Sequence, residues 1–142
     1  MTSHAENKKP IVVAAAVIMR DGKILIAQRG SQSKYAGWWE FPGGKTEPGE
    51  DLRECVRREI REELGVVISA GEELTSATHD YSDVGVGLVH LHFFLCDIVS
   101  GEPSLDRTIH SAIAWVSPRE IRSYRHLAAD KPVVDELCLR FG

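Results

Sequence analysis

Residues 43–66 decide the fold of this chain and read GGKTEPGEDLRECVRREIREELGV. The first part of this stretch is rich in glycine and contains a proline, which favours a turn over regular structure. The second part predicts an amphipathic helix that ends at Gly65. Its apolar side chains recur at steps of three and four residues: Leu52, Cys55, Val56, Ile60 and Leu64.

The predicted helix also carries a cluster of carboxylates. Glu59, Glu62 and Glu63 lie three, four and one residues apart, so they gather along one edge of the apolar face. Glu50 adds a carboxylate near the helix start, where the helix dipole favours it. Arg58 offsets part of this negative charge, and clustered carboxylate oxygens are the ligands that hard cations such as Mg²⁺ prefer.

A simpler interpretation of the same residues is a solvated surface helix. Arg53, Arg57 and Arg61 can each pair with a glutamate one turn away, as on many exposed helices. Composition alone favours this interpretation. Only the spacing of the glycines, glutamates and Arg58 along this stretch argues against it.

That spacing resembles the signature of the Nudix hydrolases. Five residues separate Gly44 from Glu50, and seven separate Glu50 from Arg58 and Glu59. The aliphatic Ile60, the pair Glu62 and Glu63, and then Gly65 and Val66 follow. Every fixed position of the signature is filled. The resemblance extends over roughly residues 11–139 and is strongest to the MutT branch, through the segments LIAQR (25–29), WEFPGGK (39–45) and ADKP (129–132).

Length and composition limit the number of domains and the classes of partner that we expect. With 142 residues, 43% apolar and 27% charged, the chain supports one domain, which we place at residues 11–142 after a polar tail at residues 1–10 that we expect to be disordered. The net charge of −4 argues against binding long nucleic acid. We find no membrane-spanning run and no signal peptide, and therefore expect a cytoplasmic protein without a membrane partner.

Candidate metal ligands outside the helix are few. The three cysteines are widely spaced without a CxxC pair, so we interpret them as reduced, mostly buried thiols. His90 and His92 share one face of a predicted strand, and we interpret them as structural or pocket-wall residues rather than metal ligands.

The remaining pattern predicts strands interleaved with helices. We expect strands at 11–19, 24–29, 87–99 and 112–116, a hairpin turn at 20–23, a helix capped by Ser117, and a C-terminal helix opened by Pro132. One of the adjacent Trp38 and Trp39 should face the site or the surface. Together with the resemblance, this predicts an α/β fold, the Nudix α/β/α sandwich with a mixed β-sheet between helices.

The resemblance also implies a site. Glu59, Glu62 and Glu63, with the main-chain carbonyl of Gly43, would bind Mg²⁺, with Mn²⁺ as a possible substitute. Glu59 would serve as ligand or general base, and Arg58 would hold Glu50 and the loop in place.

The substrate would lie beside this helix. Gly44 would line its site, Arg29 and Lys45 would contact the phosphates, and Glu40 and Phe41 would lie beside the nucleoside. Asp130 would accept N–H groups of a guanine derivative or of a cytosine, would cap the C-terminal helix, or would do both.

Ile109 departs from the pattern of the MutT branch. A further acidic residue is expected six positions before Trp115, where this chain has Ile109, followed by His110. The nearest acid is Asp106, which would reach the site only if its loop curls back, so the number of metal ions stays open.

The resemblance implies hydrolysis of a nucleoside triphosphate to a monophosphate and pyrophosphate. We rank 8-oxo-dGTP first as substrate, within a role in sanitising the nucleotide pool. CTP or a modified dCTP is the alternative. A non-catalytic Nudix-fold nucleotide sensor is the alternative from another class, and the chain could act as a monomer or a homodimer.

Overall fold

The computed structural model describes residues 10–142, so the predicted disordered tail lies, apart from Pro10, outside the described residues. Its centre is strand β1 (Ile11–Arg20). This strand pairs in parallel with β6 (Leu88–Ser100) and antiparallel with both β2 (Lys23–Arg29) and β4 (Gly43–Lys45). The sheet is therefore mixed, as predicted.

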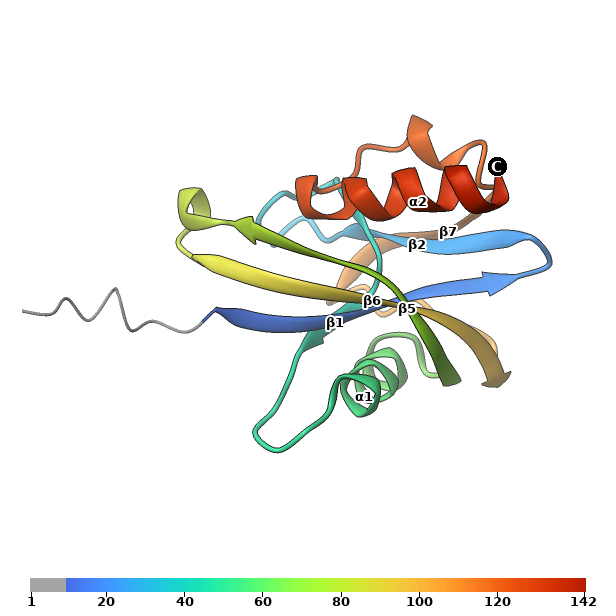
Figure 1. Cartoon of the computed structure of the whole chain (residues 1–142), viewed down its shortest axis with the longest axis horizontal. Coiled ribbons are helices and arrows are strands. Elements are labelled where there is room, and N and C mark those ends of the chain that lie inside the picture. Colours follow the sequence, from blue (N-terminus) through green and yellow to red (C-terminus); the bar gives the residue numbers. More distant parts are fainter. Residues whose placement is uncertain (1–9) are drawn as a thin grey trace, which may run out of the picture.

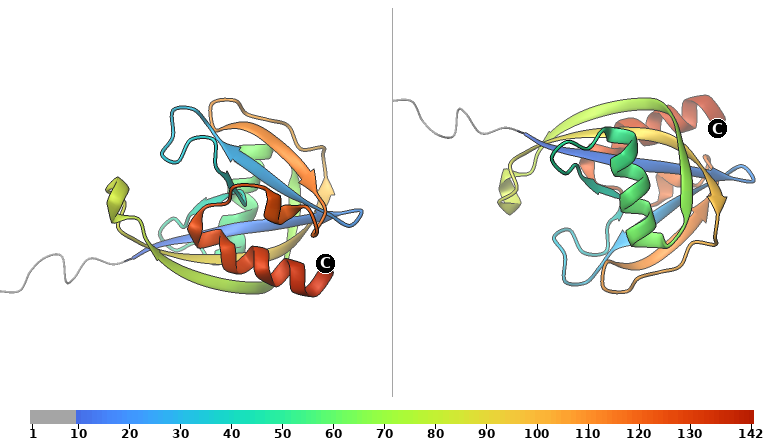
Figure 2. Two further views of the ribbon diagram at one scale, coloured as in Figure 1. Left: turned by 90° about the horizontal axis from the view of Figure 1, so that it is seen from above. Right: turned by 90° about the horizontal axis from the view of Figure 1, so that it is seen from below.

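Strand β1 is covered on both faces, which explains its unbroken apolar run. Ala14, Ala16 and Ile18 pack into the core beneath helix α1 (Leu52–Leu64), whereas Ala15 and Val17 pack into the core beneath helix α2 (Lys131–Phe141). Figure 1 shows the two helices on opposite faces of the sheet, and the two views in Figure 2 show each helix in front in turn. The α/β/α sandwich is confirmed.

The other elements complete this arrangement. The strand order is β3-β2-β1-β6-β5, with β4 paired to β1 and β7 paired to β2. The remaining strands are β3 (Trp39–Glu40), β5 (Val67–Asp80) and β7 (His110–Val116), and short 3₁₀ helices span Ser82–Val84, Ile121–Ser123 and Ala128–Asp130.

Helix α1 begins and ends where local chemistry dictates. The Asp51 carboxylate accepts the Glu54 N–H at 2.8 Å, and the Glu54 carboxylate accepts the Asp51 N–H at 3.0 Å, which forms a capping box. At the other end Gly65 has a φ of 72°, in the left-handed region, which is energetically unfavourable for most residues with a side chain. The predicted helix is confirmed.

Most strand predictions are also confirmed, with one addition. Residues 67–80 form a single long strand, β5, whose register with β6 shifts between Ala70 and Glu73 and again between Glu73 and Thr75. Arg53 of α1 donates two hydrogen bonds to the carbonyl of Gly71 within this irregularity. The contact ties α1 to the sheet at a point where regular strand pairing is interrupted.

The helix predicted after Ser117 is wrong. Ser117 and Glu120 do exchange two capping hydrogen bonds, but only the 3₁₀ helix Ile121–Ser123 follows. The next residues pair with Trp39, whose N–H donates to the Arg125 carbonyl at 2.7 Å. This pairing with a distant part of the chain holds the segment in an extended conformation, so the helix does not continue for a second turn.

The two tryptophans divide as expected. Trp39 packs against Tyr124 at the edge of the core beneath α2, with ring centroids 5.0 Å apart. Trp38 lies outside that core, with the Arg125 guanidinium 4.4 Å from its ring.

Cys55, Cys96 and Cys138 are free thiols, as predicted. Among the described residues, no helix is long and apolar enough to cross a membrane.

Gly43 provides a test of how closely β4 packs on β1. A Cβ atom at Gly43 would overlap the backbone of Ala14, which cannot move without breaking the sheet, whereas a Cβ atom at Gly44 would overlap the movable end of the Glu59 side chain. We expect Gly43→Ala to lower the free energy of unfolding by about 3 kcal/mol and Gly44→Ala to cost about 1 kcal/mol. Urea denaturation measures both, and equal losses would contradict this account.

Candidate active site

The glycine-rich turn brings the main chain against the carboxylates of α1. Gly43 and Gly44 belong to β4, and the lack of a side chain at Gly44 leaves the space that the Glu59 carboxylate occupies. The Cys55 thiol lies 3.4 Å from the Gly44 carbonyl on the same side. The glycine-rich turn and helix α1 are therefore in direct contact.

Arg58 is the centre of an ion-pair network on this helix. Its Nε and Nη2 donate to the two oxygens of Glu50 at 2.7 and 3.0 Å, and its Nη1 donates to Glu59 at 2.7 Å. Nη2 also donates to the Lys45 carbonyl at 3.0 Å. The arginine thus ties the loop to the helix. Its hydrogen bonds, together with the Glu47 N–H, lower the pKa of Glu50 to about 2.

Glu63 lies on the inner side of the cluster and is only 8% exposed. Burial, followed by the neighbouring Glu59, raises the pKa of its carboxyl to about 9. Glu62, in contrast, is exposed and lies 3.3 Å from Arg58. The three glutamates therefore occupy one helix edge, as predicted, but in different electrostatic surroundings.

A chain of polar contacts links Glu63 to the sheet. Glu40 of β3 accepts a hydrogen bond from Arg29 Nη1 at 2.8 Å on one oxygen and lies 2.9 Å from His110 Nε2 on the other. His110 Nε2 is also 4.0 Å from Glu63. Because a carboxylate only accepts, His110 carries its hydrogen on Nε2 when it bonds to Glu40.

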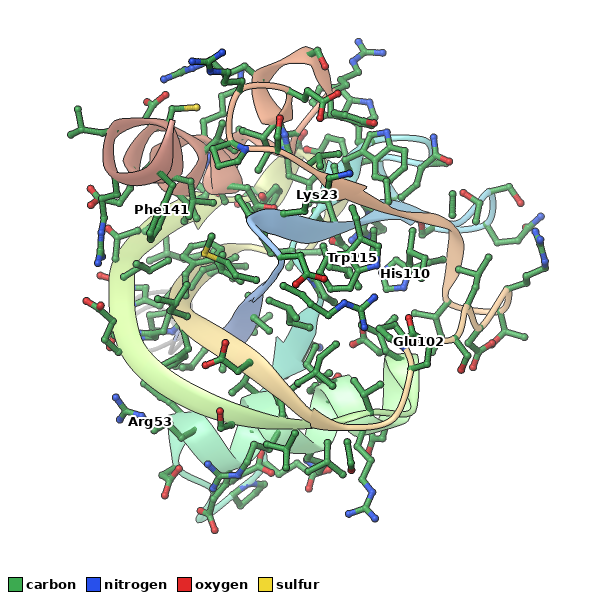
Figure 3. All side chains as sticks on the ribbon, turned by 90° about the vertical axis from the view of Figure 1, so that its right-hand side faces the viewer. Lys23, Arg53, Glu102, His110, Trp115 and Phe141 are labelled. Atoms are coloured by element: carbon green, nitrogen blue, oxygen red, sulfur yellow. The ribbon has the colours of Figure 1, made fainter. Side chains whose placement is uncertain are left out.

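The sequence did not reveal that His110 belongs to the site. It is 2% exposed, and Figure 3 shows it with Trp115 on the side of β7 that faces α1. Its only sequence signal is its position directly after Ile109, where the acidic residue was expected. Asp106 is engaged elsewhere, since its carboxylate accepts the N–H and hydroxyl of Thr108 at 2.9 and 2.6 Å.

A pocket of about 250 Å³ opens beside the glycine-rich turn. All six residues predicted to bind substrate line it: Arg29, Glu40, Phe41, Gly44, Lys45 and Asp130. His90 and His92 are not among its lining residues, and the imidazole of His92 lies 2.7 Å from the Glu73 carboxylate.

Asp130 forms a buried wall of this pocket. It is 2% exposed and stands at the N-cap position of α2, but its side chain makes no capping hydrogen bond, so that part of the prediction is wrong. Its Oδ2 instead accepts the main-chain N–H of Phe41 at 3.3 Å. Burial, followed by the charge of Glu40, raises the pKa of Asp130 well above its ordinary value. A carboxyl group that keeps its proton can both donate and accept hydrogen bonds.

The donor set beside α1 fits a hard divalent cation. Glu63 is buried with the Glu59 carboxylate as its neighbour, and carboxylate oxygens are the ligands that such cations prefer. Among residues 10–142, no three acidic, histidine or cysteine side chains already converge as metal ligands. Arg58 holds Glu59 in an ion pair, so binding an ion would require that carboxylate to share or exchange its partner.

Comparison with known proteins identifies this arrangement. Residues 8–137 match the NUDIX domain family. The chain belongs to the Nudix family. It is 43% identical over 127 residues to the CTP pyrophosphohydrolase of Escherichia coli K12, covering 89% of this chain and 90% of that protein. A putative 8-oxo-dGTP diphosphatase 2 of Mycobacterium tuberculosis H37Rv is 32% identical over 127 residues, covering 89% and 86%.

Solved structures agree with this membership. The solution structure of the E. coli ORF135 protein shares 40% identity and a TM-score of 0.79, covering 94% of this chain and 92% of that one. The MutT Nudix hydrolase of Burkholderia pseudomallei shares 30% identity and a TM-score of 0.81, covering 91% and 98%. The chain is therefore an enzyme of the Nudix type that resembles MutT along most of its length.

The raised pKa of Glu63 predicts a pH-dependent stability without divalent cations. A carboxyl group with a pKa of 4.5 in the unfolded chain and about 9 in the folded protein stabilises the fold fully below the lower value and progressively less as pH rises towards the higher one. With EDTA present, the melting temperature should fall between about pH 5 and pH 9. Glu63→Gln should flatten this fall.

Glu62→Gln is the matched control, because Glu62 lies on the same helix and is exposed. It should retain the wild-type pH dependence. If Glu63→Gln and wild-type protein lose the same melting temperature across this range, then Glu63 is not held neutral by burial.

Proposed function

We propose that the protein is a Mg²⁺-dependent nucleoside triphosphate pyrophosphohydrolase that prefers cytosine nucleotides. The reaction adds one water across a phosphoric anhydride bond and releases a nucleoside monophosphate and pyrophosphate. The observation that supports it best is the continuity of the site. The pocket reaches from the buried Asp130 to Gly43 and Gly44, directly beside the carboxylates of α1.

The metal-binding residues in this proposal are Glu59, Glu62, Glu63 and the carbonyl of Gly43. When Mg²⁺, or Mn²⁺ in its place, is held by these residues, it would supply neutralisation of phosphate charge and activation of water. Glu59 neighbours Arg58 and Glu63, and we assign to it the acceptance of a proton from the attacking water. Arg58 keeps Glu50 and the loop in position.

The phosphate contacts in this proposal come from Lys45 and Arg29. Lys45 lines the pocket and has an exposed side chain, whereas Arg29 is already engaged with Glu40 and with the carbonyl of Lys34. We therefore assign the phosphate contacts mainly to Lys45. We assign to Arg29 mainly the orientation of Glu40.

The base preference rests on Asp130 and on the relatives. A neutral carboxyl donates and accepts at once, which suits the ring nitrogen and amino group of cytosine. The E. coli relative named CTP pyrophosphohydrolase is 43% identical over 89% of this chain. These two observations support our ranking of cytosine nucleotides ahead of 8-oxo-dGTP, which the sequence alone ranked first.

8-oxo-dGTP remains the second candidate substrate. Relatives named 8-oxo-dGTP diphosphatase match this chain, among them the Proteus vulgaris protein with 38% identity over 90 residues. A neutral Asp130 can also pair with the N–H and carbonyl of a guanine ring. A role in sanitising the nucleotide pool would follow from that preference.

A panel of nucleoside triphosphates tests the proposal. We expect pyrophosphate release with Mg²⁺ and a kcat/KM for CTP or dCTP at least about tenfold above those for UTP and dGTP, because buried polar groups left unpaired by the wrong base cost several kcal/mol. A higher value for 8-oxo-dGTP would establish the second candidate instead. No pyrophosphate release from any triphosphate with Mg²⁺ or Mn²⁺ would contradict the proposal.

Paired variants separate an enzyme from a nucleotide sensor. Glu59→Gln should lower kcat at least about 100-fold while the protein stays folded, because the proton acceptor is lost. Glu72→Gln is the matched control, since Glu72 pairs with Arg140 on the opposite side of the sheet from α1. It should keep wild-type activity.

A further inference from the structure

The hydroxyl of Tyr81 is buried without a hydrogen-bond partner. Only two buried side-chain polar atoms in residues 10–142 are in this condition, and the other is Nδ1 of His126. Most buried polar groups in folded proteins are hydrogen-bonded, and an unpaired one calls for an explanation, such as a ligand that supplies the partner. Tyr81 also lines the pocket that contains Asp130.

The main chain and two neighbouring rings hold Tyr81 in this position. Its N–H donates to the Gly87 carbonyl at 2.7 Å, and its own carbonyl accepts two N–H groups from the turn that follows. The rings of His79 and Tyr35 lie 4.5 and 5.8 Å from its ring, centroid to centroid. The phenol is therefore fixed before substrate arrives, as a group that recognises substrate needs to be.

Asp130 is the second polar group in the same wall. Within residues 10–142 its carboxyl has a single hydrogen bond, from the Phe41 N–H to Oδ2, and Oδ1 has no partner among these residues. Burial and then the charge of Asp130 raise the pKa of Tyr81 to about 12. Both residues line the same pocket. The Ala129 N–H is close enough to lower that pKa slightly but does not form a hydrogen bond with good geometry.

The bond from Phe41 also orients the acid. An amide N–H prefers the carbonyl-type oxygen of a neutral carboxyl group, so the acid hydrogen belongs on Oδ1. Oδ1 then presents a donor to the pocket, while the Tyr81 oxygen is able to accept. Cytosine offers the matching edge, with an acceptor at its ring nitrogen N3 and a donor at its amino group.

We propose that the Tyr81 hydroxyl and the Asp130 carboxyl read the base together, with Asp130 donating to N3 of cytosine and Tyr81 accepting from its amino group. The inference rests on the proposed function and adds to it a specificity-determining residue, Tyr81. Uracil carries N–H at position 3, which opposes the donor on Asp130, so uracil does not take the position in which cytosine meets Tyr81. Discrimination against uracil therefore starts at Asp130, and the Tyr81 contact adds to the binding of the base that Asp130 accepts.

Tyr81→Phe tests the proposal, because it removes the hydroxyl and keeps the ring. Three substrates are compared by pyrophosphate release: CTP, UTP and ribose 5′-triphosphate, which has no base. We expect the ratio of kcat/KM for CTP to that for UTP to fall at least about tenfold, mainly through KM for CTP. Hydrolysis of ribose 5′-triphosphate should stay at the wild-type rate, because the hydroxyl does not contact the phosphates.

Tyr124→Phe is the matched control. It also removes one phenol hydroxyl, but Tyr124 packs against Trp39 and does not line the pocket. It should keep the wild-type ratio. The melting temperature of metal-free Tyr81→Phe should equal or exceed that of the wild type, because an unpaired buried hydroxyl contributes nothing to stability.

The outcomes separate this inference from the proposed function. A wild-type CTP to UTP ratio in Tyr81→Phe would overturn the inference and leave the function standing, and so would an equal loss on all three substrates. A melting temperature well below that of the wild type would also overturn it, since the hydroxyl would then be structural. If the wild-type protein cleaves no triphosphate at all, the proposed function fails first.

Discussion

Burial of carboxylates between α1 and the sheet is the constraint on which the rest of the structure depends. Glu63 is almost inaccessible to solvent and lies near Glu59 and Glu40. Removing such charges from water costs several kcal/mol each unless they are neutralised. Arg58 offsets Glu50 and Glu59, but within the described residues the only basic group recorded within 4.0 Å of Glu63 is His110. The site is thus short of positive charge in the place where a divalent cation would supply it.

Local structure around the carboxylates follows from the same constraint. The main chain of β4 lies against Glu59, and the lack of a side chain at Gly44 leaves room for that carboxylate in its present position. Glu40 connects this region to the pocket, since it is held by Arg29 and His110 on one side and contributes to the raised pKa of Asp130 on the other. The two ends of the site, which we propose for catalysis and for base binding, are therefore electrostatically linked through Glu40.

Sequence predicted those parts of the fold that local chemistry determines. Helix α1 has its period, its cap and its terminal Gly65 within one short segment, and β1 shows its two covered faces as an unbroken apolar run. The helix after Ser117 was predicted wrongly because a distant partner, Trp39, pairs with the following residues. For the site, spacing along the chain gave the glutamates, whereas Arg29, Glu40 and Asp130 came from the family resemblance. The roles of His110 and Tyr81 became visible only in three dimensions, because His110 is marked only by its position after Ile109 and nothing in the residues beside Tyr81 marks it.

A crystal structure of the protein with Mn²⁺, read by anomalous scattering, tests the central claim most directly. We predict a peak bounded by carboxylate oxygens of Glu63 and its helix neighbours Glu59 and Glu62, together with the carbonyl of Gly43, while Arg58 stays paired with Glu50. A structure in which Mn²⁺ supports activity but binds elsewhere, with Glu63 still surrounded only by protein atoms, would contradict it.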